Sequence, residues 1–417
     1  MSSFNVLISG SGIAGGAFAF WLLRAYPSAN ITIVERSPSL RLTGASVDIR
    51  SSAVDIIKWM GAEQEIRNQT TNEEGMQVVD ANGNAVATLG ATGNSDVQSI
   101  TSEFEIFRGA LAKIFMDPIM KRVKLIYDEF VDHYEQRDDG VVVTFAKSKE
   151  VKTYDLLVAA DGLWSKIRGM MLKSKPQEQL HDEGVHVAYF TIKSDLLQGG
   201  RLAKGLNATG GRAIFLRPDP DPAGRTRGML MNVTTRGDIE TKERLNRALR
   251  EGNDSYMKLM EEMFRDVGWL APEVLEGMRE SDDFYCSLFG QIRSPKLYDG
   301  RVVLLGDAGY ATPGFGTSLA IIGGYVLAGE LLSHPGDVRM ALKQYEEIML
   351  PFAKKSQGGG FAMQLFNPQT LWGIRTRNAI LAFVTWTKLD RLAMTLTWAL
   401  GITEKKAPIP DYQWPGK

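Results

Sequence analysis

A glycine-rich turn near the start of the chain has the residue types and spacing that bind the pyrophosphate of a dinucleotide. Residues 10–15 read Gly-Ser-Gly-Ile-Ala-Gly, between an apolar run at 4–9 and a stretch with helical spacing. Gly10 permits a tight turn, Gly12 lets the backbone approach a pyrophosphate, and Gly15 allows the helix to pack closely on the strand. The N–H groups of the helix N-terminus would face the phosphates. A tight turn without a ligand is the alternative, and the strand–turn–helix context disfavours it.

An acidic residue at the expected distance narrows the choice of dinucleotide. Residues 31–35 (ITIVE) are β-branched and predict a second parallel strand, which ends at Glu35, 20 residues after Gly15. A carboxylate at this place accepts hydrogen bonds from a ribose diol and disfavours a 2′-phosphate. The resident dinucleotide is therefore expected to be FAD or NAD and not NADP.

Two further motifs favour FAD over NAD. Each is an aspartate beside a glycine at the end of an apolar run: Asp161 follows residues 155–160, and Asp307 follows residues 301–305. An aspartate in this position can bind a ribose or ribityl hydroxyl, and the N-terminus of the next helix can face another polar group of the cofactor. An NAD dehydrogenase needs neither element.

With these motifs in this order, the chain resembles the group A flavoprotein monooxygenases, the family of p-hydroxybenzoate hydroxylase. The stretches 44–50 (GASVDIR) and 280–285 (ESDDFY), and the segment that begins at Gly306, look most like the tetracycline-inactivating monooxygenases and their fungal relatives. The resemblance covers essentially the whole chain. It implies bound FAD, transient NADPH or NADH, and insertion of one oxygen atom from dioxygen into a small aromatic or polyketide-like substrate through a flavin hydroperoxide.

The resemblance also implies a set of FAD-binding residues, and it identifies no catalytic base. The glycines of the first turn would hold the pyrophosphate, Glu35 the adenosine ribose, and Asp307 the ribityl chain. The pair at 161–162 would serve both FAD and the nicotinamide cofactor, and the segment 314–317 would lie near the isoalloxazine ring. The expected FAD-binding residues are Gly10, Gly12, Ala14, Gly15, Glu35, Arg36, Arg41, Asp48, Arg108, Asp161, Gly162, Asp307, Gly314, Gly316 and Thr317. Each arginine among them could instead be a solvated surface charge.

One departure from the family pattern keeps other functions open. The loop from Asp307 to Gly316 is a few residues shorter than is usual, and Phe315 stands where the family has Gln or Met. In the family this loop lies by the reactive face of the flavin. An FAD-dependent oxidase or cyclase that has lost oxygenation is therefore an alternative, and a non-enzymatic flavin-binding redox sensor is another.

The elements that must position these residues predict an α/β fold with discontinuous domains. A Rossmann-like FAD-binding domain is expected from residues 1–75, 101–174 and 291–335. A substrate domain on an antiparallel sheet is expected from residues 76–100 and 175–290, with an Asn-Gly hairpin at 76–90. Helices in residues 336–417 are expected to bridge the domains. Their aromatic residues, Trp372, Phe383, Trp386 and Trp398, are expected to pack there, with a membrane or partner helix as the alternative.

Composition excludes several other classes of function. Lys+Arg 48 against Asp+Glu 49 leaves a formal charge of −1, so no basic field is available for nucleic acid. The single cysteine, Cys286, fits a reducing compartment, and the four histidines show no metal-ligand spacing. With no signal peptide or membrane span evident, we expect a soluble cytoplasmic protein, a monomer or weak dimer.

Overall fold

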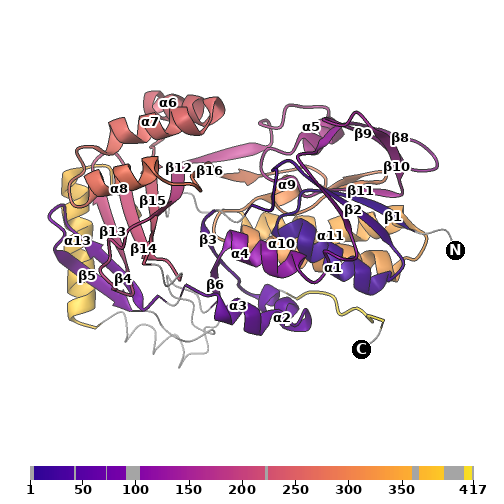
Figure 1. The fold of residues 1–417 in the computed structure, drawn as a ribbon, viewed down its shortest axis with the longest axis horizontal. Helices are drawn as coiled ribbons and strands as arrows, with labels where there is room; N and C mark the ends of the chain where they lie inside the picture. The colour runs from indigo at the N-terminus through magenta and orange to yellow at the C-terminus, as the bar shows by residue number, and fades with distance from the viewer. Residues whose placement is uncertain are drawn as a thin grey trace.

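The computed structural model describes residues 4–41, 44–71, 73–90, 104–220, 224–358, 366–388 and 408–415. In these ranges the chain forms two large sheets side by side, each with its own helices (Figure 1). The α/β fold class with a Rossmann-like part is confirmed. Both ends of the described chain lie at the Rossmann-like half, far from the outer edge of the second sheet (Figure 1).

The first sheet has six strands in the order β17-β18-β11-β1-β2-β7. All neighbours are parallel except the β17–β18 pair. Its strands are β1 (Asn5–Ser9), β2 (Asn30–Glu35), β7 (Lys124–Tyr127), β11 (Leu156–Ala159), β17 (Tyr298–Asp299) and β18 (Val302–Leu304). Strands from distant parts of the chain therefore meet with their carboxyl ends at one edge, where the three predicted motifs begin.

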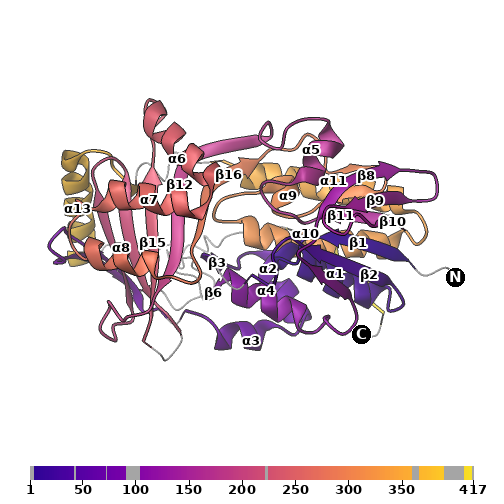
Figure 2. The same ribbon diagram turned by 45° about the horizontal axis from the view of Figure 1, so that its top comes forward.

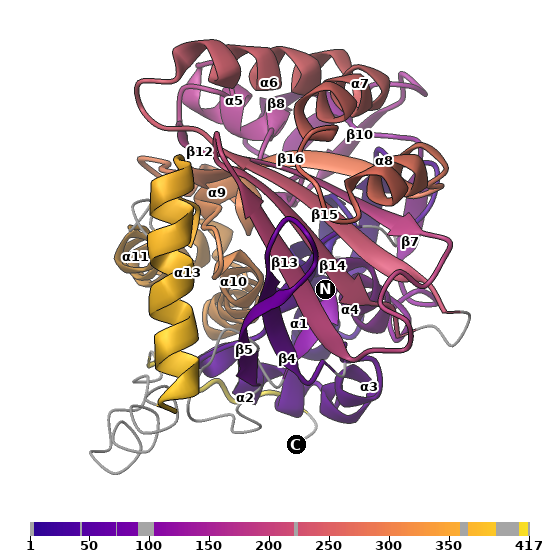
Figure 3. The same ribbon diagram turned by 90° about the vertical axis from the view of Figure 1, so that its left-hand side faces the viewer.

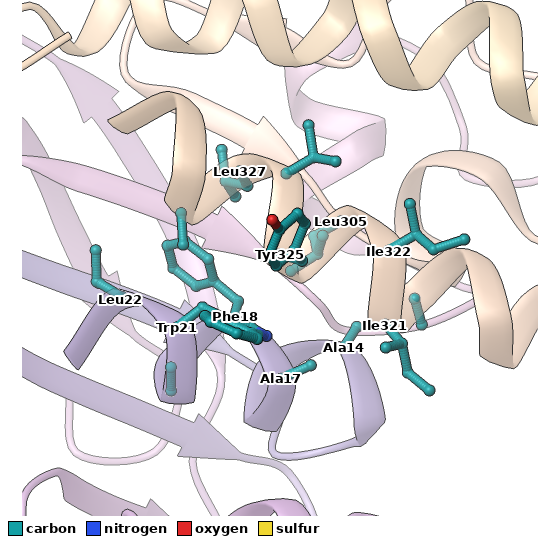
Figure 4. Packing of buried hydrophobic residues seen from close by; sticks show 14 of the residues in the cluster. Ala14, Ala17, Phe18, Trp21, Leu22, Leu305, Ile321, Ile322, Tyr325 and Leu327 are labelled. Carbon is teal, nitrogen blue, oxygen red and sulfur yellow. The ribbon is translucent and has the colours of Figure 1, made fainter. Parts of the chain in front are cut away.

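Two apolar helices form the core beneath this sheet. Helix α1 (Ile13–Ala25) packs along α10 (Gly316–Ser333), and Phe18, Trp21 and Tyr325 fill the space between them (Figure 4). The helices approach closely because Gly324 has no side chain: a Cβ there would lie 2.8 Å from the backbone nitrogen of Phe18. By length and composition α10 could cross a membrane, but 78% of it is buried inside the protein.

The second sheet has seven strands in the order β16-β12-β15-β14-β13-β4-β5. Only the β13–β4 pair is parallel. The strands are β4 (Gly75–Val79), β5 (Ala85–Gly90), β12 (Leu180–Ile192), β13 (Leu202–Ala208), β14 (Arg212–Pro218), β15 (Thr226–Val233) and β16 (Tyr285–Ile292). The hairpin predicted at 76–90 is thus confirmed as β4–β5.

Side chains alternate between the two faces of the second sheet, as the pleat of a β-strand requires. One face packs under α6 (Ile239–Glu251), α7 (Asn253–Phe264) and α8 (Ala271–Arg279) (Figure 2). Phe190 and Leu230 lie in the core on this side. The opposite face carries Tyr189, Phe215, Met229 and Phe289. That second face is available to line a site.

Smaller elements join the two sheets. A two-stranded sheet of β3 (Ser46–Asp48) and β6 (Glu105–Phe107) lies between them, and β6 leads directly into α4 (Arg108–Met116). The remaining described elements are α2 (Ser52–Trp59), α3 (Glu63–Asn68), β8 (Val131–Gln136), β9 (Val141–Phe145), β10 (Val151–Tyr154), α5 (Lys166–Leu172), α9 (Asp307–Tyr310), α11 (Val338–Ser356) and α13 (Leu371–Trp386).

The C-terminal part of the chain contacts both halves in separate pieces. Helix α11 packs on α10, whereas α13 packs on β5 and β13 at the outer edge of the second sheet (Figure 3). The chain then returns to the first half, where the Trp414 ring lies 4.5 Å from that of Trp21, centroid to centroid. On α13, Trp372 and Trp386 are about four-fifths exposed. These aromatics therefore do not form the interdomain packing expected for them; Trp398 lies outside the described residues.

Residues 52–68 form two helices and not one, because the chain turns at Gly61, whose φ of +72° suits glycine. Helix α4 ends at Met116. The predicted domain boundaries themselves stay a prediction.

Candidate cofactor and substrate site

The glycine turn has the shape that a pyrophosphate requires. Gly10 has a φ of +110°, and a Cβ there would lie 2.3 Å from the Ala160 carbonyl oxygen. A Cβ on Gly15 would lie 2.1 Å from the Gly10 carbonyl oxygen, so close packing excludes a side chain at both positions. A Cβ on Gly12 would meet nothing within 4 Å. The turn is therefore tight on its protein side and open at Gly12, where the phosphates would approach.

Glu35 lies directly beside this turn. One carboxylate oxygen accepts hydrogen bonds from the Ser11 backbone N–H and hydroxyl, both at 3.0 Å, and the other accepts from the Ser37 N–H at 2.9 Å. The carboxylate is thus held at the carboxyl end of β2. Its contact with the adenosine ribose stays a prediction. Arg36, the next residue, is exposed.

The second motif presents a buried, incompletely bonded carboxylate. Oδ1 of Asp161 is shielded from solvent and has no hydrogen-bond partner among the residues that the structure describes, and burial raises the pKa of this carboxyl group. Next to it, the fully buried Arg168 donates to the carbonyl oxygens of Leu163 and Ala308, both at 2.8 Å, and of Pro176 at 2.7 Å. Burial lowers the pKa of Arg168 to about 10, so it stays charged at neutral pH. The orphaned oxygen of Asp161 is one that a bound cofactor hydroxyl could satisfy.

The third motif contacts the first and the predicted Arg108. Gly306 has a φ of +62°, and a Cβ there would lie 2.8 Å from the Cβ of Ala14. Asp307 Oδ2 lies 3.7 Å from Arg108 Nη2, and a Cβ on Gly316 would lie 3.2 Å from Asp307 Oδ1. The structure therefore brings these residues together at the N-terminus of α10.

The remaining predicted residues lie around this group. Gly162 and Gly314 have positive φ and a Cβ on either would meet nothing within 4 Å, and Thr317 is half-buried in the first turn of α10. Asp48 forms a 2.7 Å ion pair with Arg50, while its Oδ1 is buried without a hydrogen-bond partner in the described part of the chain. Burial, and then the charge of Glu105, raise the pKa of Asp48.

Arg41 is directed toward the second sheet. Its guanidinium lies 5.5 Å from the ring centroid of Tyr285, the first residue of β16. Arg41 thus contacts Tyr285, a residue of the stretch 280–285 that carries the family resemblance. Its contact with a flavin stays a prediction.

A cavity of about 260 Å³ opens between the two halves, next to these groups. The free face of the second sheet forms one wall, and the loop at 44–46 and Phe107 form the other. Its lining residues are Gly44, Ala45, Ser46, Phe107, Tyr189, Phe190, Phe215, Arg217, Arg227, Gly228, Met229, Met231, Asp283 and Phe289. The walls are mainly aromatic and aliphatic, with two arginines and one aspartate as the charged groups.

Sequence reasoning did not find the two arginines of this cavity. Arg217 is two residues from Phe215 on β14, and Arg227 is two residues from Met229 on β15. Because side chains two residues apart in a strand share a face, this spacing could have placed both arginines on the apolar face. The partner of Arg217, Glu73, lies 144 positions away in a loop and carries no motif. Only the register of the sheet brings these residues to one site.

Comparison with known proteins assigns the family. No protein-family model matches the chain. It is 34% identical to the monooxygenase CTB7 of Cercospora beticola, over 100% of this chain and 99% of that protein. It is 30% identical to the FAD-dependent monooxygenase asL4 of Sarocladium schorii, over 99% of each chain. The chain belongs to the FAD-dependent monooxygenases.

A solved structure supports the assignment. The tetracycline destructase Tet(51) superposes with a TM-score of 0.77 at 27% identity, over 98% of this chain and 100% of that one. The resemblance stated from the three motifs is thereby confirmed, as are the enzyme class, an oxidoreductase, and FAD as the cofactor. The open Gly12 and the orphaned oxygens of Asp48 and Asp161 fit a dinucleotide. The role of each FAD-binding residue stays a prediction.

Proposed function

We propose that this FAD-dependent monooxygenase uses NADPH or NADH to insert one oxygen atom from dioxygen into a small aromatic or polyketide-like substrate. The observation that carries the proposal is the aromatic-lined cavity between the second sheet and the loop at 44–46, beside the converging motifs. Bound FAD would supply the redox chemistry, the passage of electrons from the nicotinamide to dioxygen.

We infer that the FAD-binding residues divide between the two ends of the cofactor. Gly10, Gly12 and Glu35 would hold the pyrophosphate and the adenosine ribose. Asp307 would bind the ribityl chain, held in place by Arg108. The N-terminus of α10 would face the flavin ring, as in other sites where a helix N-terminus stabilises negative charge.

The cavity walls would exclude water and orient the substrate. Phe107, Phe215 and Met229 supply apolar surface on both sides of the cavity. Tyr189 lines it with a phenol whose pKa is raised by burial, so this group stays protonated and can donate a hydrogen bond. It would therefore fix a substrate oxygen and would not remove a proton.

The test is reduction and reoxidation of the purified holoenzyme. NADPH or NADH should reduce the bound flavin without oxygen, and a compact aromatic substrate should accelerate this reduction. On mixing with air, a hydroperoxide absorbance should precede oxidised flavin. Reoxidation that yields peroxide alone, with every substrate tried, would contradict the proposal. That outcome would favour the oxidase alternative, for which the short loop at 307–316 is the motivating observation.

A further inference from the structure

We propose that the cavity selects planar aromatic substrates that carry no carboxylate. This inference rests on the proposed function, because it takes the cavity to be the substrate site. It concerns which ligands bind there, and binding can be measured without turnover. The two arginines in the cavity wall, Arg217 and Arg227, and their protein partners determine which ligand charge the cavity accepts.

The two arginines stand directly opposite each other. Arg217 of β14 and Arg227 of β15 are register partners in the antiparallel ladder. Like charges at directly opposed positions repel, so such a pair needs compensation. The compensation could come from a ligand anion or from the protein, and the contacts of each arginine distinguish these possibilities.

Arg217 is fully engaged by the protein. Its Nε and Nη2 donate to the two carboxylate oxygens of Glu73 at 2.7 and 2.8 Å. Nη2 also pairs with Glu105, and Nη1 donates to the Ser46 hydroxyl. All three guanidinium nitrogens thus have protein partners, and two carboxylates oppose one positive charge.

Arg227 has two carboxylate partners of its own. Its Nε lies 2.8 Å from Asp219 Oδ2, and its Nη1 donates to Thr191 Oγ1 at 2.7 Å and to Asp283 Oδ2 at 3.1 Å. One face of the guanidinium lies over the Phe107 ring, 4.5 Å from its centroid. Asp219 also faces Arg225, at 3.8 Å, so these two arginines share it.

A substrate carboxylate would therefore find no uncompensated positive charge among the described residues that line the cavity. It would instead approach Asp283, which is itself in the cavity wall. Burial alone would raise the pKa of Asp283, but hydrogen bonds from Thr191 and Ser281 lower it, so this group is ionised at neutral pH. Repulsion between like charges is strong where water is excluded. A neutral ring avoids this cost and packs on Phe215 and Phe289.

The size of the cavity sets the scale of the probes. Pockets for drug-sized ligands span roughly 300–1,000 Å³, so a cavity of about 260 Å³ suits a compact bicyclic ring system. Three probes share such a ring: 2-naphthol, 6-hydroxy-2-naphthamide and 6-hydroxy-2-naphthoate. The amide and the carboxylate have nearly the same size and differ in charge.

The experiment is an equilibrium titration of the FAD-loaded enzyme with each probe at neutral pH, followed by the change in flavin absorbance. We expect 2-naphthol and the amide to bind, and the carboxylate to bind at least about tenfold more weakly than the amide. Binding of the carboxylate as tightly as the amide would overturn the proposal. Failure of both neutral probes to bind would overturn it as well.

A pair of neighbouring variants isolates the charge. Asp283→Asn should raise the affinity for the carboxylate at least about threefold and leave that for the amide nearly unchanged. Asp282→Asn, at an exposed position paired with Lys193, should change neither. An unchanged carboxylate-to-amide ratio in Asp283→Asn would contradict the assignment. Loss of oxygenation activity would leave this ratio unaffected, so failure of the proposed function is distinguishable.

Discussion

Arg168 donates a hydrogen bond of 2.8 Å to the carbonyl oxygen of Ala308, and one buried guanidinium thereby joins the second cofactor motif to the third. The same side chain also donates to the carbonyl oxygens of Leu163 and Pro176. Two loops that are 140 positions apart in sequence are thus held in one relative position. An arginine can donate to all three carbonyl oxygens from two of its nitrogens, whereas a lysine has only one side-chain nitrogen.

Replacing Arg168 should destabilise the fold. Arg168→Met leaves three carbonyl oxygens without a donor and Asp161 without its nearby cation, so we expect unfolding free energy to fall by roughly 3–5 kcal/mol. Urea denaturation measures this. Arg137→Met, which removes an exposed arginine paired with Glu135, should cost no more than about 1 kcal/mol. Equal losses in the two variants would contradict the role of Arg168.

Gly12 and Gly15 should respond differently to the same substitution. Gly12 has a φ of −73° and open space at its Cβ, so Gly12→Ala should leave the stability of the apoprotein unchanged or raise it by about 0.5 kcal/mol. The added methyl group would occupy the approach of the pyrophosphate and weaken FAD binding by about tenfold or more.

Gly15→Ala is the matched counterpart. Its methyl group would overlap the Gly10 carbonyl oxygen, so the apoprotein itself should lose about 3 kcal/mol of stability. Urea denaturation of the apoproteins and titration with FAD separate the two effects. If Gly12→Ala bound FAD as tightly as the wild type, the pyrophosphate would not lie at this turn.

Glu129 should make the free energy of unfolding fall as the pH becomes acidic. Burial alone would raise its pKa, but the N–H groups of Lys147 and Ser148 lower it to about 2 from the ordinary 4.5. Because the pKa of this carboxyl group is lower in the folded state than in the unfolded state, its ionised form stabilises the fold at a pH above the unfolded-state pKa. This contribution is lost as pH falls from about 4.5 toward 2. The shift corresponds to about 3 kcal/mol at pH 7, and more than half of this should be lost by about pH 3.

The Glu129→Gln variant tests this dependence. Its stability deficit should be largest at neutral pH and shrink toward pH 3 in urea titrations. Glu135→Gln, which changes an exposed carboxylate, should show a small deficit at every pH. A deficit for Glu129→Gln that stays constant down to about pH 3 would contradict the pKa assignment.

Arg217 should be needed to join the two halves. Arg217→Met leaves Glu73 and Glu105 buried without their cation, so we expect a loss of roughly 3–5 kcal/mol at pH 7. The loss should be smaller near pH 5, because burial raises the pKa of Glu73, and without the Arg217 cation this carboxyl group then binds a proton. Arg201→Met, which removes an exposed arginine beside Glu74, is the control and should cost about 1 kcal/mol or less. A deficit that grows as pH falls would contradict the account.

The cofactor side of the site could be predicted because its signals are local. The turn at 10–15, the acid at Glu35 and the aspartate at Asp307 each lie in a short motif, and the order of the motifs implied their convergence. An apolar run made β1 predictable, and a β-branched run made β2 predictable as well. The family then followed from a few short stretches.

The substrate side could not be predicted because its contacts are set by sheet register. Arg217 meets Glu73 and Glu105 only after β14, the loop before β4, and β6 have been brought together. The exposed aromatics of α13 show a related difficulty. An apolar stripe in a sequence does not reveal which surface covers it, and Trp372 is 77% exposed in the described structure.

Product analysis under labelled dioxygen tests the central claim most directly. The FAD-loaded enzyme would be supplied with NADPH, a compact aromatic substrate and ¹⁸O₂, and the product examined by mass spectrometry. The account predicts a product with one ¹⁸O atom for each NADPH consumed productively. A turned-over product without the label, or NADPH oxidation that ends only in labelled peroxide with every substrate that binds the cavity, would contradict it.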